Sequence, residues 1–376
     1  MTFVALELSA RVYLEHFASE PRFVSFASFR QLEKRYGADG SGLKQLYAPH
    51  RYLGYYPTPG YEKGANRHNA LGYRGDEIAV PKPAGEFRIV CVGGSTTYDS
   101  DIEDWTLTYP SQLEQELRRR GQSNVSVVNA GAAGWTSWES LIDFELRVLD
   151  LEPDLVIVHD ALNDVHPRFV WPPELYRGDG SGYRAPNSSG LFMPSVLEYS
   201  TVLRALMIRA GWITPHADLS RTIDRLAPSY YGDLWRDQKR TASYPSGIFT
   251  DVGGEAMLAA NDSRYFVRNL DNLIASARAH DVAVVMLSFP YSPEFPEEPR
   301  VSTPEYHRAI ADQNQALREL ASRRGVTLLD LAQLFPSAKR FYTDGRHQNP
   351  EGAALKAGII ADFLLREKLV GGRPPS

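Results

Sequence analysis

The chain has a single cysteine, Cys91, in 376 residues, which excludes an intramolecular disulfide and a metal site built from several cysteines. It has no apolar run of about 18 residues, so no segment is expected to span a bilayer, and no signal peptide is evident. Long basic runs are also missing, and acidic and basic residues are mixed at a formal net charge of -5. This excludes the clustered positive surface of a nucleic-acid-binding protein. None of these absences decides the compartment or the oligomeric state.

Residues 1–85 are predicted to form an accessory region that packs onto a core domain. The region contains many tyrosines, glycines and prolines, a composition typical of loops whose aromatic side chains pack onto something else. Two interpretations of its start, residues 2–17, stay open. Glu7 and Arg11 are spaced for a helical i,i+4 pair, which favours a docked surface helix. Alternatively, the chain begins where the membrane anchor of a longer relative ends.

Strand and helix patterns alternate five times through the rest of the chain. Short apolar runs predict strands over residues 87–92, 125–128, 154–158, 282–288 and 326–331. Amphipathic patterns predict helices over residues 110–120, 137–149, 265–280, 305–324 and 350–368. Such alternation is typical of a parallel sheet with helices on both faces. We therefore predict an α/β fold with three αβα layers and a flavodoxin-like sheet of about five parallel strands. Its core is divided between residues 86–165 and 265–370.

Residues 166–264 interrupt this alternation after the third predicted strand, and we interpret them as one large insertion. Helices are expected near residues 196–210 and 219–226. A connection of this length is usually functional, and it leaves the sheet at the end where ligands bind. We predict that it is a lid or substrate wall over the active site, with a packing or dimerisation surface as the alternative. Its large aromatic residues fit two interpretations equally well, an acyl or sugar pocket and a small local core. These residues are Trp171, Tyr176, Tyr183, Phe192, Trp212, Tyr230, Tyr231 and Trp235.

A candidate nucleophile follows the first predicted strand, at the edge where a parallel sheet binds its ligands. Gly93 and Gly94 permit a sharp turn and a close approach of substrate to the backbone. Ser95 then starts the next helical turn, where free N–H groups favour a developing anion. A phosphate-binding turn is the alternative, but neither a Walker pattern nor a G-x-G-x-x-G pattern is present.

Candidate hydrogen-bond donors follow the second and third predicted strands. Residues 129–137 (NAGAAGWTS) leave backbone N–H groups open at small residues. Asn163 carries a side-chain amide that can donate to an oxyanion. For each segment taken alone, a turn is the preferred explanation: a turn selected for its backbone angles at residues 129–137, and an Asx turn at Asn163.

A candidate base lies near the end of the chain. Asp344 and His347 are three residues apart, just before Asn349 and Pro350, which predict the start of a helix. This spacing lets the carboxylate accept from the imidazole Nδ1–H, which leaves Nε2 free as a base towards a serine. The alternative is a capped turn with a surface histidine.

Taken together, in this chain order, these motifs resemble the SGNH (GDSL-like) hydrolase family. The resemblance covers about residues 86–165 and 265–368 and rests on GGST at 93–96, Gly134 in NAGAAGWT, ALND at 161–164 and DGRH at 344–347. The NALGYR stretch at 69–74 also looks like the lead-in of some members. Two departures stand out: Ala161 replaces the usual glycine and adds a methyl beside the oxyanion hole, and Gly94 stands where the eponymous Asp would be.

The resemblance implies a serine esterase acting on carboxylic esters. Ser95 would attack the ester carbonyl, His347 would transfer the proton and Asp344 would orient His347. The N–H groups of Ser95 and Gly134 and the Asn163 amide would form the oxyanion hole. Neither a metal nor an organic cofactor is implied, and the expected partner is a small-molecule, carbohydrate or lipid ester. The alternatives are an O-acyltransferase or deacetylase acting on acylated carbohydrate and a non-catalytic carbohydrate-binding protein on the same fold.

Two other candidate sites, a single cysteine and a set of four residues, have simpler explanations. Cys91 lies within an apolar strand and is predicted to be a buried core thiol rather than a nucleophile. A metal site can also be drawn from four residues around the third strand end. Side chains there point to opposite faces, however, so we predict that they do not converge on a metal: His159, Asp160, Asp164 and His166.

Overall fold

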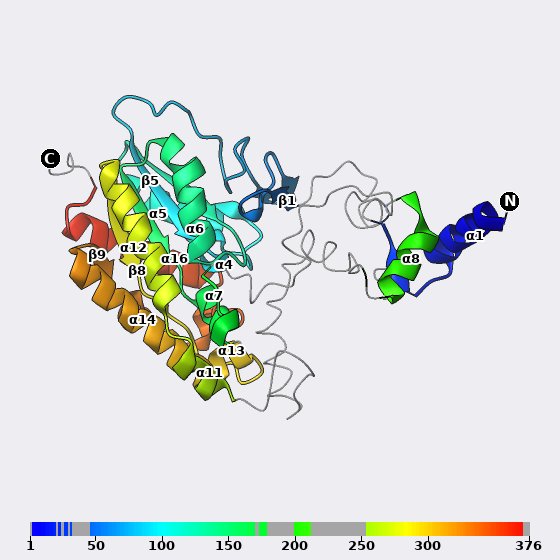
Figure 1. Cartoon of the computed structure of the whole chain (residues 1–376). Helices are drawn as coiled ribbons and strands as arrows, with labels where there is room; N and C mark the ends of the chain where they lie inside the picture. The colour runs from blue at the N-terminus through cyan, green and yellow to red at the C-terminus, as the bar shows by residue number, and fades with distance from the viewer. Residues whose placement is uncertain are drawn as a thin grey trace. The chain divides into compact units, whose positions relative to one another are not determined.

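The protein is represented by a computed structural model (Figure 1), which describes residues 2–19, 22–23, 26–28, 31, 46–169, 173–178, 199–210, 212 and 253–370. Contacts divide the chain into two compact units, one of residues 1–58 and 184–230 and the other of residues 59–183 and 231–376. The sequence-based boundaries at residues 85, 165 and 264 stay predictions.

The larger unit contains a five-stranded parallel sheet with the spatial order β6-β5-β7-β8-β9. Its strands are β5 (Phe87–Gly93), β6 (Val125–Gly131), β7 (Leu155–His159), β8 (Ala283–Leu287) and β9 (Thr327–Leu329). Numbered along the chain from β5, this order is 2-1-3-4-5, so the predicted flavodoxin-like α/β fold is confirmed. The strand order reverses between β5 and β7. Ligands bind beyond the carboxyl ends of strands at such a reversal, which directs attention to the segments after β5, β6 and β7.

Helices cover both faces of this sheet (Figure 1). One face carries α5 (Tyr109–Arg119) and α16 (Pro350–Arg366); the other carries α6 (Ser137–Asp143), α12 (Arg264–Ala279) and α14 (Pro304–Arg324). Successive strand side chains alternate between the two faces. Ile89 and Cys91 therefore belong to the first apolar core and Val90 and Val92 to the second. Cys91 is fully buried, and burial raises its pKa to about 12, which confirms a core thiol.

Shorter elements of the same unit connect the sheet and the large helices. They are the hairpin β3 (Glu62–Lys63) and β4 (Asn66–Arg67) and the helices α4 (Ser95–Tyr98), α7 (Leu162–Val165), α11 (Gly254–Ala260), α13 (Pro299–Ser302) and α15 (Leu331–Leu334). Short 3-10 turns span Trp105–Leu107, Leu149–Leu151, His166–Arg168, Pro173–Leu175 and Lys339–Phe341.

In the sheet-containing unit, two predicted element boundaries differ from the structure by three residues or more, and the others by at most two residues. The strand predicted to stop at residue 128 continues to Gly131, because Asn129 to Gly131 pair with Cys91 to Gly93 of β5. The helix predicted to end at residue 149 is α-helical only to Asp143 and then widens into a π-helical turn, Phe144–Val148. Local sequence patterns do not report either feature, since both depend on neighbours in the fold.

The smaller unit contains a helix pair and a hairpin. These are α1 (Thr2–His16), α8 (Thr201–Arg209), β1 (Tyr47–His50) and β2 (Gly54–Pro57). The helix predicted over residues 2–17 is confirmed, and its Glu7–Arg11 pair forms at 2.7 Å. The Glu7 carboxylate also accepts from the Thr201 N–H, at 2.8 Å, so it caps the start of α8. The helix predicted at residues 219–226 lies outside the described residues.

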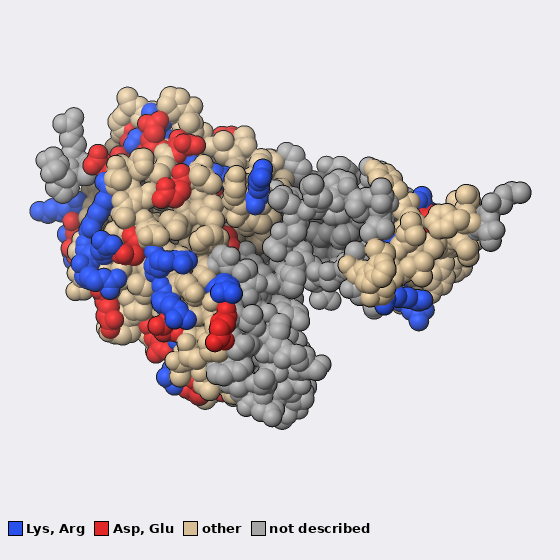
Figure 2. Space-filling view, viewed as in Figure 1, with Lys and Arg blue, Asp and Glu red and all other residues tan. Residues whose placement is uncertain are grey.

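Surface charge follows the mixed pattern of the sequence. On the face shown in Figure 2, Lys and Arg side chains lie among Asp and Glu side chains across the sheet-containing unit. Ion pairs such as Arg324 with Asp271 and Arg318 with Asp330 contribute to this mixture. Over the ranges that the structure describes, no helix is both long and apolar enough to cross a bilayer.

Candidate active site

The turn after β5 presents Ser95 at the start of α4. Gly93 has a φ of +153°, and a Cβ atom there would lie 2.4 Å from the His159 carbonyl oxygen and 2.5 Å from Thr97 Oγ1. Only glycine fits this position, because both its backbone angle and the adjoining strand β7 exclude a side chain. The close approach brings the end of β7 directly beside the turn that carries Ser95.

Asp344, His347 and Ser95 form one hydrogen-bonded chain. His347 Nε2 lies 2.7 Å from Ser95 Oγ, and His347 Nδ1 lies 2.9 Å from Asp344 Oδ2. The second carboxylate oxygen, Oδ1, accepts from the backbone N–H groups of Arg346 and His347, at 3.0 and 2.9 Å. Gly345 has a φ of +86° and permits the tight turn that brings carboxylate and imidazole together. The two groups predicted from their spacing thus meet a serine that lies far from them in the sequence.

The charge on Asp344 is strongly stabilised. Burial alone raises the pKa of this carboxyl group, but the hydrogen bonds and charges of His347 and Arg346 outweigh burial and hold the pKa well below its usual range. Arg346 contributes a direct bond, with Nε donating to Asp344 Oδ2 at 2.7 Å. An acceptor that stays ionised keeps the imidazole proton on Nδ1 and leaves Nε2 as the acceptor for the serine hydroxyl.

A second carboxylate, Asp101, also lies beside His347. Its Oδ2 is 3.7 Å from His347 Nδ1 and accepts a hydrogen bond from the Thr343 hydroxyl. Sequence reasoning missed this residue, which follows Ser95 by six positions in an acidic loop, DSDIED, with no recognisable spacing to His347. Its distance is longer than that of Asp344, so its effect on the imidazole is electrostatic rather than a hydrogen bond.

Asn163 also lies beside the turn that carries Ser95. Its Nδ2 donates to the Trp135 carbonyl oxygen at 2.7 Å, which orients the amide and leaves its second N–H free of that bond. A Cβ atom at Gly94 would lie only 2.6 Å from Asn163 Nδ2 and 2.9 Å from the Trp135 oxygen. The glycine that replaces the eponymous Asp therefore has a structural reason in this chain: it makes room for the Asn163 amide.

A cavity of about 10 Å³, close to the space that one water molecule needs, lies at this junction. Ser95, Asn163 and Ala161 are among its lining residues. Asp164 fixes the neighbouring segment, because its carboxylate accepts from the backbone N–H of Ser137 at 2.9 Å. Gly134 lies one residue before Trp135, and its role as a backbone donor stays a prediction.

Arg74 explains the lead-in motif NALGYR. Its guanidinium group donates to the carbonyl oxygens of Tyr98 and Asp99, at 2.6 and 2.9 Å, and of Ile102 and Glu103, at 2.5 and 3.1 Å. These carbonyls form the end of α4 and the loop after it. The sequence pointed to the segment but not to this residue, whose carbonyl partners lie 24 to 29 positions away.

The residues considered as a metal site do not share one environment. His159 Nδ1 faces the Lys356 ammonium at 3.1 Å, whereas His166 Nδ1 lies 2.9 Å from the Tyr306 hydroxyl. Within the described ranges, the one group of metal-ligating side chains that converges is Asp101, Asp344 and His347, which is the site already described.

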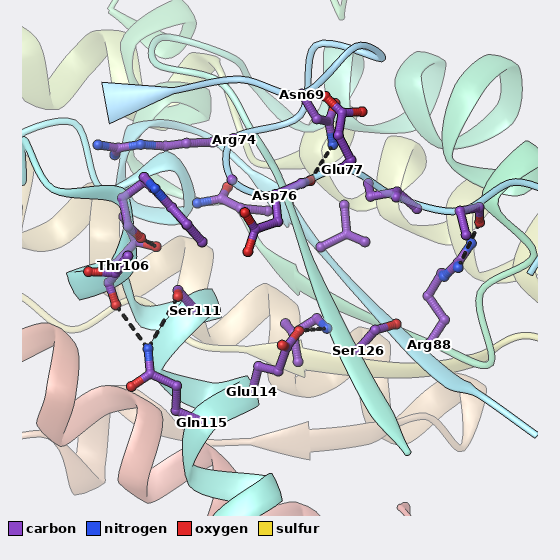
Figure 3. A pocket seen from close by; sticks show the side chains of 18 of the residues that line it. Asn69, Arg74, Asp76, Glu77, Arg88, Thr106, Ser111, Glu114, Gln115 and Ser126 are labelled. Carbon is purple, nitrogen blue, oxygen red and sulfur yellow. Dashed lines mark hydrogen bonds between the residues drawn. The ribbon is translucent and has the colours of Figure 1, made fainter. Parts of the chain in front are cut away.

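A larger cavity of about 390 Å³ lies along the outer edge of β6, beneath the lead-in segment (Figure 3). Carboxylates of Asp76, Glu77 and Glu114 border it, and Glu114 accepts from the Val127 N–H at 2.7 Å. Neither Ser95 nor His347 lines this cavity, so it is separate from the site that these two residues form with Asp344.

Comparison with known proteins identifies the family of the chain. The chain matches the GDSL-like lipase/acylhydrolase family over residues 91–355 and belongs to this family. Similar solved structures include a lipase/acylhydrolase from Enterococcus faecalis (16% identity, TM-score 0.43, covering 77% of this chain and 99% of that one). They also include an acetyl xylan esterase, AlAXEase (13%, 0.42, 74% and 100%), and a GDSL-like lipase from Bacteroides thetaiotaomicron (15%, 0.40, 78% and 93%). No curated protein matches the chain in sequence.

Proposed function

We propose that this protein is a serine esterase that hydrolyses carboxylic esters through an acyl-enzyme on Ser95. The observation that carries the proposal is the continuous chain from Asp344 Oδ2 through His347 to Ser95 Oγ, with contacts of 2.9 and 2.7 Å. A serine hydroxyl is a weak nucleophile by itself and needs an adjacent, oriented base. That requirement is met here by residues from two distant parts of the chain.

The reaction proceeds in two halves. Ser95 Oγ attacks the ester carbonyl while its proton moves to His347 Nε2, and the resulting imidazolium, stabilised by Asp344, then protonates the departing alcohol. In the second half, water attacks the acyl group with His347 again as base, which releases the acid and restores Ser95. The N–H groups of Ser95 and Gly134 and the Asn163 amide serve as donors to the tetrahedral oxyanion in both halves.

Substitution of Ser95 tests the proposal directly. Ser95→Ala is expected to lower the hydrolysis of p-nitrophenyl acetate by several orders of magnitude and to abolish labelling by a fluorophosphonate probe, because both need the nucleophile. Ser123→Ala is the matched control, since Ser123 is an exposed serine in the turn before β6. The assignment is wrong if Ser95→Ala keeps more than a few per cent of activity at an unchanged melting temperature.

Two alternatives are separated by further measurements. A non-catalytic carbohydrate-binding protein predicts no probe labelling of the wild-type chain. An O-acyltransferase predicts labelling but transfers the acyl group to an added sugar alcohol faster than to water, which product analysis detects. The predicted lid, residues 166–264, is described only in part: Tyr176 is buried and packs with Val165 and Phe169, whereas Trp171 lies outside the described residues. A chain-length series of p-nitrophenyl esters tests whether this segment limits the acyl group.

A further inference from the structure

A buried lysine lies behind the nucleophile turn. Lys356 belongs to α16, and its side chain is fully enclosed. Its ammonium group donates to the Thr96 carbonyl oxygen at 2.9 Å, lies 3.1 Å from His159 Nδ1 and sits 3.8 Å from the centre of the Tyr109 ring. An ammonium group carries three donors and no acceptor, and these three partners are two acceptors and an aromatic face. The pocket is therefore built to hold a cation.

Other charged groups around Lys356 come from several elements. Burial lowers the pKa of Lys356 to about 8. The charge of Asp99, in the loop after α4, attracts the ammonium group and opposes this shift. Burial also raises the pKa of Asp99, to about 6, against the charges of Lys356, Arg74 and His347. Placing a lysine in such surroundings is costly unless it is paired. Its position behind the reacting serine points to a specific use.

The helix α4 needs an external partner. It has four residues, Ser95–Tyr98, and its N-cap residue, Gly94, provides no capping side chain. A single helical turn is not stable alone, because forming the first turn fixes several residues for very few hydrogen bonds. The Thr96 carbonyl belongs to the Thr96–Thr97 peptide, so the bond from Lys356 fixes a peptide one residue beyond the nucleophile. Arg74 holds the far end of the same helix through Tyr98 and Asp99.

Lys356 also determines the tautomer of His159. Because the ammonium group can only donate, His159 Nδ1 must accept, and the neutral ring carries its proton on Nε2. Burial, followed by the Lys356 charge, lowers the pKa of His159 well below its usual value, which agrees with a neutral ring. His159 also lines the small cavity that Ser95 and Asn163 border. One amine thus fixes both the Thr96–Thr97 peptide of the nucleophile turn and a wall of the cavity beside it.

We propose that Lys356 is a positioning residue for Ser95, which holds the nucleophile turn through the Thr96 carbonyl and holds His159 in one tautomer in the adjoining cavity wall. The inference rests on the proposed esterase function. Lys356 acts through Thr96 and His159, so its loss affects the placement of Ser95 rather than the binding of substrate.

The test compares Lys356→Met with wild type. Methionine keeps an unbranched side chain of similar length but has no donor. Because a displacement of about 1 Å can cost on the order of 100-fold in rate, kcat for p-nitrophenyl acetate is expected to fall by about 10-fold to 100-fold, with KM within about threefold. The rate of fluorophosphonate labelling should fall by the same factor. Arg366→Met is the matched control, because Arg366 is an exposed cation on the same helix, and it should behave as wild type.

A second pair of variants keeps the proposal testable if Lys356→Met does not fold. Asn and Leu have nearly the same shape, but only the Asn oxygen can accept from Lys356 where Nδ1 does. His159→Asn should therefore keep a kcat at least fivefold above that of His159→Leu. In wild-type protein, nitrogen-15 NMR of His159 should show a protonated Nε2 and a bare Nδ1. A mixture of tautomers, equal kcat values for the His159 pair, or a kcat of Lys356→Met within twofold of wild type overturns the proposal. Activity that survives Ser95→Ala would instead overturn the esterase function itself.

Discussion

Replacing Gly94 with alanine is expected to disable the proposed oxyanion hole without touching the proposed triad. The new methyl group would lie 2.6 Å from Asn163 Nδ2 and 2.9 Å from the Trp135 carbonyl oxygen. Gly94 has a φ of -83°, so alanine brings no penalty of the left-handed region and the effect comes from contact alone. Both atoms that the methyl meets belong to one hydrogen bond, the 2.7 Å contact that orients the Asn163 amide.

The size of the effect follows from these distances. An ordinary contact of a Cβ atom is 3.4–4 Å, so the Asn163 amide must withdraw by most of an ångström from its 2.6 Å position. It cannot simply rotate away, because the Trp135 oxygen that anchors it is backbone and is itself crowded. Losing one oxyanion donor typically costs about 10²–10³ in kcat, or about 3–4 kcal/mol. Gly94→Ala should therefore fall in this range, with little change in KM.

Steady-state kinetics with p-nitrophenyl acetate measure the effect, and thermal unfolding checks the fold. Gly358→Ala in α16 is the matched control: its methyl meets open space, so activity should be unchanged and stability should rise by about 0.5–1 kcal/mol. If Gly94 and Asn163 act through one interaction, the double variant Gly94→Ala/Asn163→Ala should be no slower than the worse single variant. A Gly94→Ala enzyme with kcat within about threefold of wild type would refute the reasoning.

Three further predictions concern single side chains. Asn163→Ala should lower kcat by about 10²–10³ with nearly constant KM; a change confined to KM would show that the amide binds the ground state instead. Asp344→Asn should lower kcat by about 10⁴, whereas Asp101→Asn should cost less than about tenfold, since its oxygen lies 3.7 Å from the imidazole; equal losses would contradict the assignment of the orienting carboxylate. The pKa of Asp344 is lower in the folded state than in the unfolded state, where it is about 3.9. The Asp344 charge therefore stabilises the fold fully above the unfolded-state pKa, and this stabilisation is lost as the pH falls towards the folded-state pKa. Wild type should therefore lose more unfolding free energy than Asp344→Asn between about pH 5 and pH 2, and parallel curves would argue against this interaction.

Local sequence was sufficient for the elements and for the residues whose partners lie close by. The run Phe87–Gly93 and its four counterparts are apolar because a parallel strand is buried on both faces, so each could be recognised without knowledge of its neighbours. Asp344 and His347 could be paired because a turn of four residues fixes their geometry. Asn349 could be named as the N-cap of α16 for the same reason, and its side chain accepts from the Gly352 N–H at 2.9 Å.

The order of the strands and the contacts between residues that are distant in the sequence were decided by the tertiary structure. β5 lies between β6 and β7, which places Gly93 level with both Gly131 and His159 and thereby brings three separate loops together. The environments of Gly94, Arg74 and Lys356 also depend on distant parts of the chain. Arg74 and Lys356 donate to carbonyl oxygens 24 and 260 positions away, at 2.6 and 2.9 Å, and Gly94 has no room for a Cβ atom beside the Asn163 amide. No pattern along one strand or helix encodes such distances, because packing of buried groups fixes them only when all the elements have assembled.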